Sequence, residues 1–165
     1  LGPFTTLSTY ARKVATNVAE SKIEFILVDS IGFIDDMHKI IVDAFNATLS
    51  EIANAETIVL FLVASEDLKT LQRKLSASNK ILRQIGASGS IVIVANKIDL
   101  VSTEALQKVV ETIGEHFPGV DVVSISARNG KNIDQLMHQI AEKLNPKDKT
   151  SAIAVQLAHN ELLVP

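Results

Sequence analysis

The chain has 165 residues, of which 47% are hydrophobic and 21% are charged, and its formal net charge is -3. This profile predicts one globular domain with a substantial core, and it argues against a general nucleic-acid binder while leaving room for a local basic patch. The absence of cysteine excludes disulfide partners and cysteine-ligated metals, and it fits a reducing, cytoplasmic location. The longest apolar runs have the length of strands, so we expect no membrane association through a spanning helix, and no signal peptide is recognisable.

Strand and helix patterns alternate along the chain. In chain order we predict strands at 14–19 and 24–29, a helix at 38–53, a strand at 57–64, a helix at 67–85, a strand at 90–95, a helix at 103–117, a strand at 120–126, a helix at 132–144, a polar linker at 145–150 and a further candidate strand at 151–158. This alternation predicts an α/β fold with a doubly wound, mostly parallel sheet and helices on both faces.

Three of these elements carry the most informative patterns. The runs 14–19 and 24–29 lie so close together that they predict an antiparallel hairpin at one edge of the sheet. The run 57–64 is almost wholly apolar, which is typical of a strand in a sheet covered on both faces. Apolar residues at helical spacing predict a long amphipathic helix at 67–85, and Gly86 fits as its C-cap.

The tetrapeptide Asn96-Lys97-Ile98-Asp99 directly follows the predicted strand 90–95. An N-K-x-D sequence at the carboxyl end of a strand resembles the element with which Ras-like GTPases read guanine, although alone it also fits an Asn-Lys turn after a strand. In that resemblance the Asp carboxylate accepts two N–H bonds from the guanine edge. Adenine cannot offer these bonds, and the wrong base would leave a buried charge unpaired. The Lys stem can lie along the base, and the Asn can join neighbouring loops.

The sequence Asp29-Ser30-Ile31-Gly32 ends the predicted strand 24–29. The sequence resembles the D-x-x-G element of GTPases, in which the Asp holds Mg²⁺, usually through water, and the Gly amide meets the γ-phosphate. Gly is favoured there because the backbone must come very close to the phosphate. The pattern alone also fits an ordinary turn. Its place at the carboxyl end of a strand favours the ligand interpretation, since α/β sheets bind ligands at that edge.

Two shorter sequences complete the candidate site. A hydroxyl of Thr5-Thr6, before the first strand, could supply a Mg²⁺ ligand from Thr6, although adjacent threonines in a loop are common. Ser126-Ala127, at the end of the strand after N-K-x-D, places the backbone N–H of Ala127 where it could donate to the guanine oxygen. Each pair carries little information by itself, and each gains weight from the order of the whole set.

In this order the set resembles the translation-factor-like, Ras-like GTPases. The stretch Ile26-Leu-Val-Asp-Ser-Ile-Gly-Phe-Ile34 and the following Ile41-Val-Asp-Ala-Phe-Asn-Ala-Thr-Leu-Ser-Glu51 resemble the HflX family in particular, which carries D-T-V-G-F-I and then A-F-x-A-T-L-x-E. Ser30 and Ile31 depart from that pattern. The opening Phe4-Thr-Thr-Leu7 is similar to the family's first switch.

The resemblance implies a GTP-binding protein that hydrolyses GTP with Mg²⁺ and associates with the large ribosomal subunit. It implies GTP or GDP contacts at these positions: Asp29, Gly32, Asn96, Lys97, Asp99, Ser126 and Ala127. It further implies Mg²⁺ ligands at Thr6 and Asp29, and switch residues at Thr5, Thr6 and Phe33. No catalytic residue is assigned, because Phe33 stands after D-x-x-G where related hydrolases often place a water-orienting Gln. We therefore expect slow intrinsic hydrolysis, with the water positioned by another group or by a partner.

One element of the family is absent from the sequence, which has no G-x-x-x-x-G-K-[ST] phosphate loop. The resemblance places the strand before that loop in mid-sheet, between 24–29 and 57–64, and its loss would leave two apolar edges unpaired. Three explanations are open. The sequence could omit residues that precede Leu1, the chain could be a truncated or degenerate relative, or the candidate strand 151–158 could fill the vacant slot as in a permuted domain.

Two interpretations follow from these observations. In the first, residues 1–145 are a partial GTPase domain, residues 146–165 are a linker with the possible start of a C-terminal region, and the intact protein is a GTPase while this chain alone is inactive. In the second, the chain is a pseudo-GTPase or guanine-nucleotide-binding module without turnover. A nucleotide-free interaction domain with fortuitous motifs is a third alternative.

Overall fold

The computed structural model describes residues 10–18, 21–30, 46–144 and 151–157. Six strands form one sheet in the order β1-β2-β6-β3-β4-β5. The strands are β1 (Tyr10–Val18), β2 (Ser21–Ser30), β3 (Thr57–Val63), β4 (Ser90–Asn96), β5 (Asp121–Ser124) and β6 (Ser151–Leu157). The helices are α2 (Asn46–Ala53), α3 (Leu68–Gln84), α4 (Thr103–His116) and α5 (Ile133–Lys143), with a short 3-10 helix η1 (Ile98–Leu100). The predicted doubly wound α/β fold is confirmed.

The hairpin β1–β2 is antiparallel, as predicted, and every other pair of neighbouring strands is parallel. β1 begins at Tyr10, four residues before the predicted start, because its polar first half pairs with the second half of β2. β5 is shorter than predicted and ends at Ser124. The helix predicted at 38–53 is described from Asn46 onward, and its first residues lie outside the described part of the chain.

The central position of the sheet is filled by β6. Phe25 of β2 aligns with Ser151, and Thr57 of β3 aligns with Ile153, both in parallel register. The expectation of two unpaired edges is wrong, because β6 pairs with both of these strands. This arrangement matches the permuted-domain alternative. The predicted domain boundary near residue 145 stays a prediction, although residues 151–157 belong to the same sheet as the hairpin.

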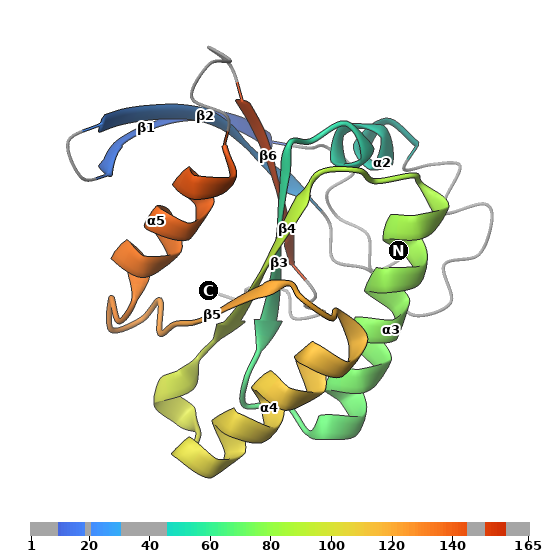
Figure 1. Cartoon of the computed structure of the whole chain (residues 1–165), viewed down its shortest axis with the longest axis vertical. Coiled ribbons are helices and arrows are strands. Elements are labelled where there is room, and N and C mark those ends of the chain that lie inside the picture. The colour runs from blue at the N-terminus through green and yellow to red at the C-terminus, as the bar shows by residue number, and fades with distance from the viewer. Residues whose placement is uncertain (1–9, 19–20, 31–45, 145–150, 158–165) are drawn as a thin grey trace, which may run out of the picture.

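Helices cover both faces of the sheet (Figure 1). Side chains alternate between these faces and build a core on each. Ile58 and Leu60 of β3 pack with α2, α3 and α4 on one face. Val59, between them in sequence, packs with α5 on the other face. The period-2 alternation of the strands thus explains why the apolar run of β3 is continuous and why both of its faces are covered.

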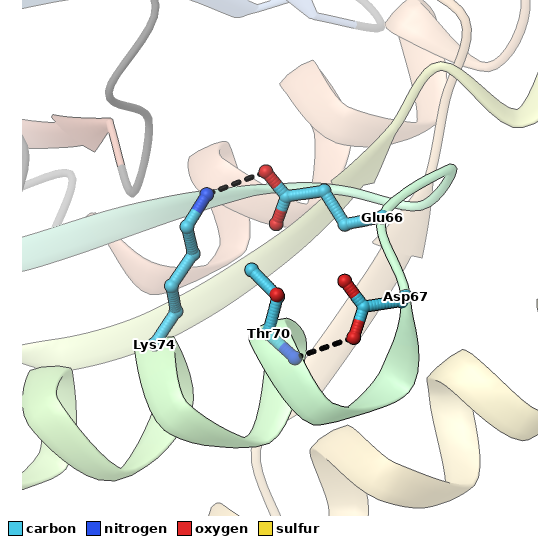
Figure 2. Close-up of polar contacts among 4 residues, drawn as sticks. All are labelled: Glu66, Asp67, Thr70 and Lys74. Carbon is cyan, nitrogen blue, oxygen red and sulfur yellow. Dashed lines mark hydrogen bonds and ion pairs between the residues drawn. The ribbon is translucent and has the colours of Figure 1, made fainter.

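The loops after β3, β4 and β5 lead into α3, η1 and α4, and α5 from the same edge of the sheet. Asp67 caps α3, because its side chain accepts a hydrogen bond of 2.9 Å from the backbone N–H of Thr70 (Figure 2). Ser102 caps α4 in the same way, with a bond of 3.2 Å from Ala105 N. These caps fix where each helix begins relative to the carboxyl edge, which is where the candidate site residues gather.

Candidate functional site

The tetrapeptide Asn96-Lys97-Ile98-Asp99 leaves the sheet at the carboxyl end of β4. The carbonyl of Asn96 accepts a hydrogen bond of 2.8 Å from Ala64 N, after β3. Lys97 then takes the left-handed conformation, with φ of 65°, which turns the chain sharply into η1. Ile98 N donates to Ile125 O at 3.2 Å. The tetrapeptide is therefore held on both sides, by the loop after β3 and by the segment after β5.

Asn96 joins the two loops that carry the site. Its Oδ1 accepts one hydrogen bond of 2.8 Å from Lys97 N and another of 3.1 Å from Ala127 N. The first bond stabilises the turn after β4, and the second attaches the loop after β5 to that turn. An aliphatic side chain at position 96 would leave both N–H groups without this acceptor, so the amide oxygen explains why an Asn stands here.

Asp99 is exposed and is oriented by Ser126, which is fully buried. The Ser126 hydroxyl donates a hydrogen bond of 2.6 Å to Asp99 Oδ1. This bond lowers the pKa of Asp99 below its ordinary value, and the positive charges of Arg128 and Lys97 act in the same direction. The carboxylate is thus kept ionised, and its position relative to the loop after β5 is fixed.

The loop that follows β5 is stabilised by hydrogen bonds within itself and to the end of β5. Ser126 and Lys131 exchange backbone hydrogen bonds of 3.2 and 3.1 Å, and Asn129 N donates to Ser126 Oγ at 3.3 Å. Asn132 takes a left-handed conformation with φ of 61°, and its Nδ2 donates to Ser124 O at 2.7 Å. The loop therefore holds Ser126 and Ala127 in place by contacts within itself.

Two residues of this loop were missed by reasoning from the sequence. Arg128 contributes positive charge beside Asp99, and the Ser-Ala-Arg order could have indicated it. Asn132 was predicted as the first residue of a helix, but it precedes α5 and returns to β5. The residue type could have indicated this turn position before the helix, because Asn tolerates the left-handed conformation and its side chain can bond a nearby backbone group.

The predicted phosphate-side residues lie at the same edge of the sheet or outside the described residues. Asp29 is the penultimate residue of β2 and aligns with Val155. The register places Asp29 level with Val155, Val59 and Val92, four residues before Asn96. Three strand spacings and a rise of four residues put the backbones of Asp29 and Asn96 about 19 Å apart. Thr5, Thr6, Gly32 and Phe33 lie outside the described residues. The structure thus brings together Asn96, Lys97, Asp99, Ser126 and Ala127.

Among the residues that the structure describes, no group of three or more His, Asp or Glu side chains could hold a metal ion by itself. In the same part of the chain, no helix is long and apolar enough to cross a bilayer.

The chain matches the elongation factor Tu GTP binding domain family over residues 9–146. This chain belongs to that family. The match covers all the candidate site residues except Thr5 and Thr6, and it includes every described strand except β6. Within the GTP-binding domain family, the predicted resemblance to HflX is confirmed by individual relatives.

GTPase HflX of Methanocaldococcus jannaschii is 32% identical over 142 residues, which are 86% of this chain and 34% of that relative. GTPase HflX of Thermococcus kodakarensis is 38% identical over 140 residues, covering 81% of this chain and 30% of the relative. GTPase HflX of Escherichia coli (strain K12) is 32% identical over 143 residues, which are 86% of this chain and 32% of that relative. The chain therefore spans about a third of the length of the curated relatives that it matches.

Solved structures agree with the family. The crystal structure of SsGBP in complex with GDP has a TM-score of 0.65 at 32% identity, covering 79% of this chain and 41% of that one. The structure of a variant of Aquifex aeolicus Era bound to GDP.AlF4- has a TM-score of 0.64 at 20% identity, covering 91% and 49%. The second likeness concerns the fold alone, and the resemblance to a Ras-like sheet is confirmed.

Proposed function

We propose that this chain carries the guanine-recognition part of an HflX-like GTPase that binds and hydrolyses GTP in the intact protein. The observation that carries the proposal is the contact between Ser126 Oγ and Asp99 Oδ1, together with the bond from Ala127 N to Asn96 Oδ1. These two contacts assemble an ionised carboxylate, a backbone donor and a lysine stem at one sheet edge.

The chemistry of this edge suits a guanine base. The Asp99 carboxylate offers acceptors for the ring N–H and the amino group of guanine. The Ser126 hydroxyl donates to this carboxylate and holds it in place. The Ala127 N–H would donate to the guanine oxygen, sharing its bond with Asn96 Oδ1. The stem of Lys97 would lie along the base. An adenine would present the opposite donor and acceptor pattern to the carboxylate. Its binding would therefore be weaker by the free energy of at least one hydrogen bond to a charged group.

Mg²⁺ would lie on the phosphate side, with Asp29 and Thr6 as ligands. A single carboxylate and a hydroxyl are hard oxygen donors of the kind that Mg²⁺ accepts alongside nucleotide phosphates and water. Asp29 fits this role by its place at the carboxyl end of β2, on the edge where Asn96 also lies. Gly32 would approach the γ-phosphate, and Thr5, Thr6 and Phe33 would form the switch. When bound, Mg²⁺ would supply charge neutralisation of the phosphates.

The large ribosomal subunit is the proposed partner, and the cytoplasm the proposed location, because the curated relatives are HflX GTPases. A second candidate is a guanine-nucleotide-binding module without turnover. It is favoured by β6, which occupies the slot of the sheet where the resemblance places the strand before the phosphate loop. Release of inorganic phosphate from GTP by the intact protein distinguishes the two, because the module would bind nucleotide and release none even there.

The base assignment is tested by Asp99→Asn. This change exchanges an acceptor for a donor, so preference should move from guanine toward xanthine nucleotides. Competition between GDP and xanthosine diphosphate for the protein, followed with a fluorescent GDP analogue, measures the shift. We expect the ratio of the two affinities to change by about 10-fold or more.

The matched control is Asp134→Asn, which makes the same change at an exposed position in the first turn of α5. This variant should keep the wild-type preference. If Asp99→Asn also keeps it, Asp99 does not read the base.

A further inference from the structure

Helix α3 has a charge composition unlike that of the other described helices. Its sequence contains basic residues and no acidic residue, in a chain whose net charge is -3. By contrast, α4 and α5 mix acidic and basic residues. The basic residues of α3 are Lys69, Arg73, Lys74, Lys80 and Arg83.

Four of the five basic residues share one side of α3. Steps of four, seven and three residues separate Lys69, Arg73, Lys80 and Arg83. At 3.6 residues per turn, these steps place all four within a stripe about 80° wide. All four are exposed, whereas Leu71, Leu75 and Leu82 form the buried side of the helix. We call these four residues the α3 stripe, and it is about 21 Å long.

Lys74, the fifth basic residue, differs from the stripe in its surroundings. It points away from the stripe and pairs with Glu66 before the helix, where both side chains are largely buried, at 14% and 19% exposure (Figure 2). Among the described residues, no carboxylate forms an ion pair with Lys69, Lys80 or Arg83. Arg83 instead donates from Nε to Asn79 Oδ1 at 2.9 Å, which orients its guanidinium. The charges of these three residues are therefore directed at solvent, whereas that of Lys74 is compensated.

We propose that the α3 stripe docks on the phosphate backbone of an RNA helix. A row of exposed Lys and Arg over about 21 Å matches the regular negative charge of a nucleic-acid backbone. Exposed Ser76 lies on the same side and can donate to a phosphate oxygen as well. The stripe has no aromatic or apolar side chain at its centre, where protein interfaces concentrate such residues, and this disfavours an acidic protein as the occupant. The choice of RNA rests on the proposed ribosomal partner.

The test is the binding of a fluorescein-labelled RNA hairpin to the full chain without nucleotide, measured by anisotropy. Phosphate contacts from Lys69, Lys80 and Arg83 predict binding that weakens about 40-fold between about 50 and 200 mM salt. Lys80→Gln should reduce the slope of log affinity against log salt by about one, and Lys80→Gln with Arg83→Gln by about two. Lys108→Gln, which changes an exposed lysine on α4, is the matched control and should leave the slope unchanged.

Other outcomes overturn the proposal. If labelled polyglutamate binds with the affinity of the hairpin and responds to the same variants, the surface serves an acidic protein. If a DNA hairpin of the same sequence binds equally well, the assignment to RNA is wrong. If Lys108→Gln changes the slope as much as Lys80→Gln, the attraction does not reside in the stripe. Because no nucleotide is present, failure of the guanine assignment would leave these results interpretable.

Discussion

Among single residues, Ser126 is the side chain on which the ionisation of Asp99 depends. Ser126→Ala removes the hydroxyl that donates to Asp99 Oδ1, so the pKa of Asp99 should rise toward that of an ordinary aspartate. Because this pKa is lowered in the folded state, the stabilising contribution is present above the ordinary pKa and is lost as the pH falls through the lowered one. NMR titration of side-chain carboxyl shifts in the acid range measures the difference.

Asp67 provides an internal control for that titration. Its pKa is also lowered, mainly by hydrogen bonds from Thr70, and Thr70 is remote in sequence from Ser126. Ser126→Ala should therefore move the titration of Asp99 and leave that of Asp67 in place. Identical Asp99 curves in the two proteins would show that the Ser126 hydroxyl does not hold this carboxylate.

At the scale of elements, Gly89 marks a close approach between the turn after α2 and the start of β4. A Cβ at this position would lie 2.1 Å from the carbonyl oxygen of Ala55 and 2.9 Å from that of Glu56. Both atoms belong to the backbone, and Ser90 N donates to Glu56 O at 2.8 Å, so neither can move without disturbing the pairing of β3 and β4. Gly89→Ala should lower the free energy of unfolding by about 1–3 kcal/mol in urea denaturation.

Gly114, inside α4, allows a matched comparison. A Cβ there meets nothing within 4 Å, and the position is exposed. Gly114→Ala should stabilise the protein by about 0.5–1 kcal/mol, because alanine loses less conformational freedom in a helix. Equal effects of the two substitutions would mean that the approach at Gly89 does not constrain the fold.

For the whole molecule, β6 is the strand on which the continuity of the sheet depends. Ala154 aligns with Val28 on one side and Ile58 on the other, in the middle of the sheet. Ala154→Pro removes a backbone donor from this central ladder and should cost about 1–3 kcal/mol or more of unfolding free energy. Ser151→Pro, at the first residue of β6, should cost much less, because proline is tolerated where a strand begins. Thermal melting monitored by circular dichroism compares them, and equal midpoints would contradict the central position of β6.

Local sequence patterns predicted most of the helices and strands. They did not predict the contacts between residues of the site. The apolar run of β3 and the spacing of α3 depend on neighbours in sequence, so both were predicted within a few residues. Tyr10 to Lys13 were not predicted as strand, because an edge strand accepts polar residues that otherwise indicate a loop.

The site was predicted as a set of motifs and not as a geometry. The spacing of Asn96 and Asp99 indicated a base-reading tetrapeptide, but nothing local showed that Ser126 Oγ would donate to Asp99. That contact joins residues 27 positions apart, and it depends on the parallel pairing of β4 and β5. The place of β6 stayed one of three alternatives for the same reason, since its partners are set by the completed sheet and not by its own sequence.

The place of β6 also has a consequence for how the chain reaches its native state. Asp29 pairs with Val155, near the other end of the sequence, so β2 has its hairpin partner early but its parallel partner only when the last strand is available. Contacts of such long sequence separation slow folding, because much chain entropy is lost before they form. During synthesis, the edges of β2 and β3 that pair with β6 would remain without hydrogen-bond partners until β6 has been made. Such edges are exposed to wrong pairing, so refolding yield should fall as protein concentration rises.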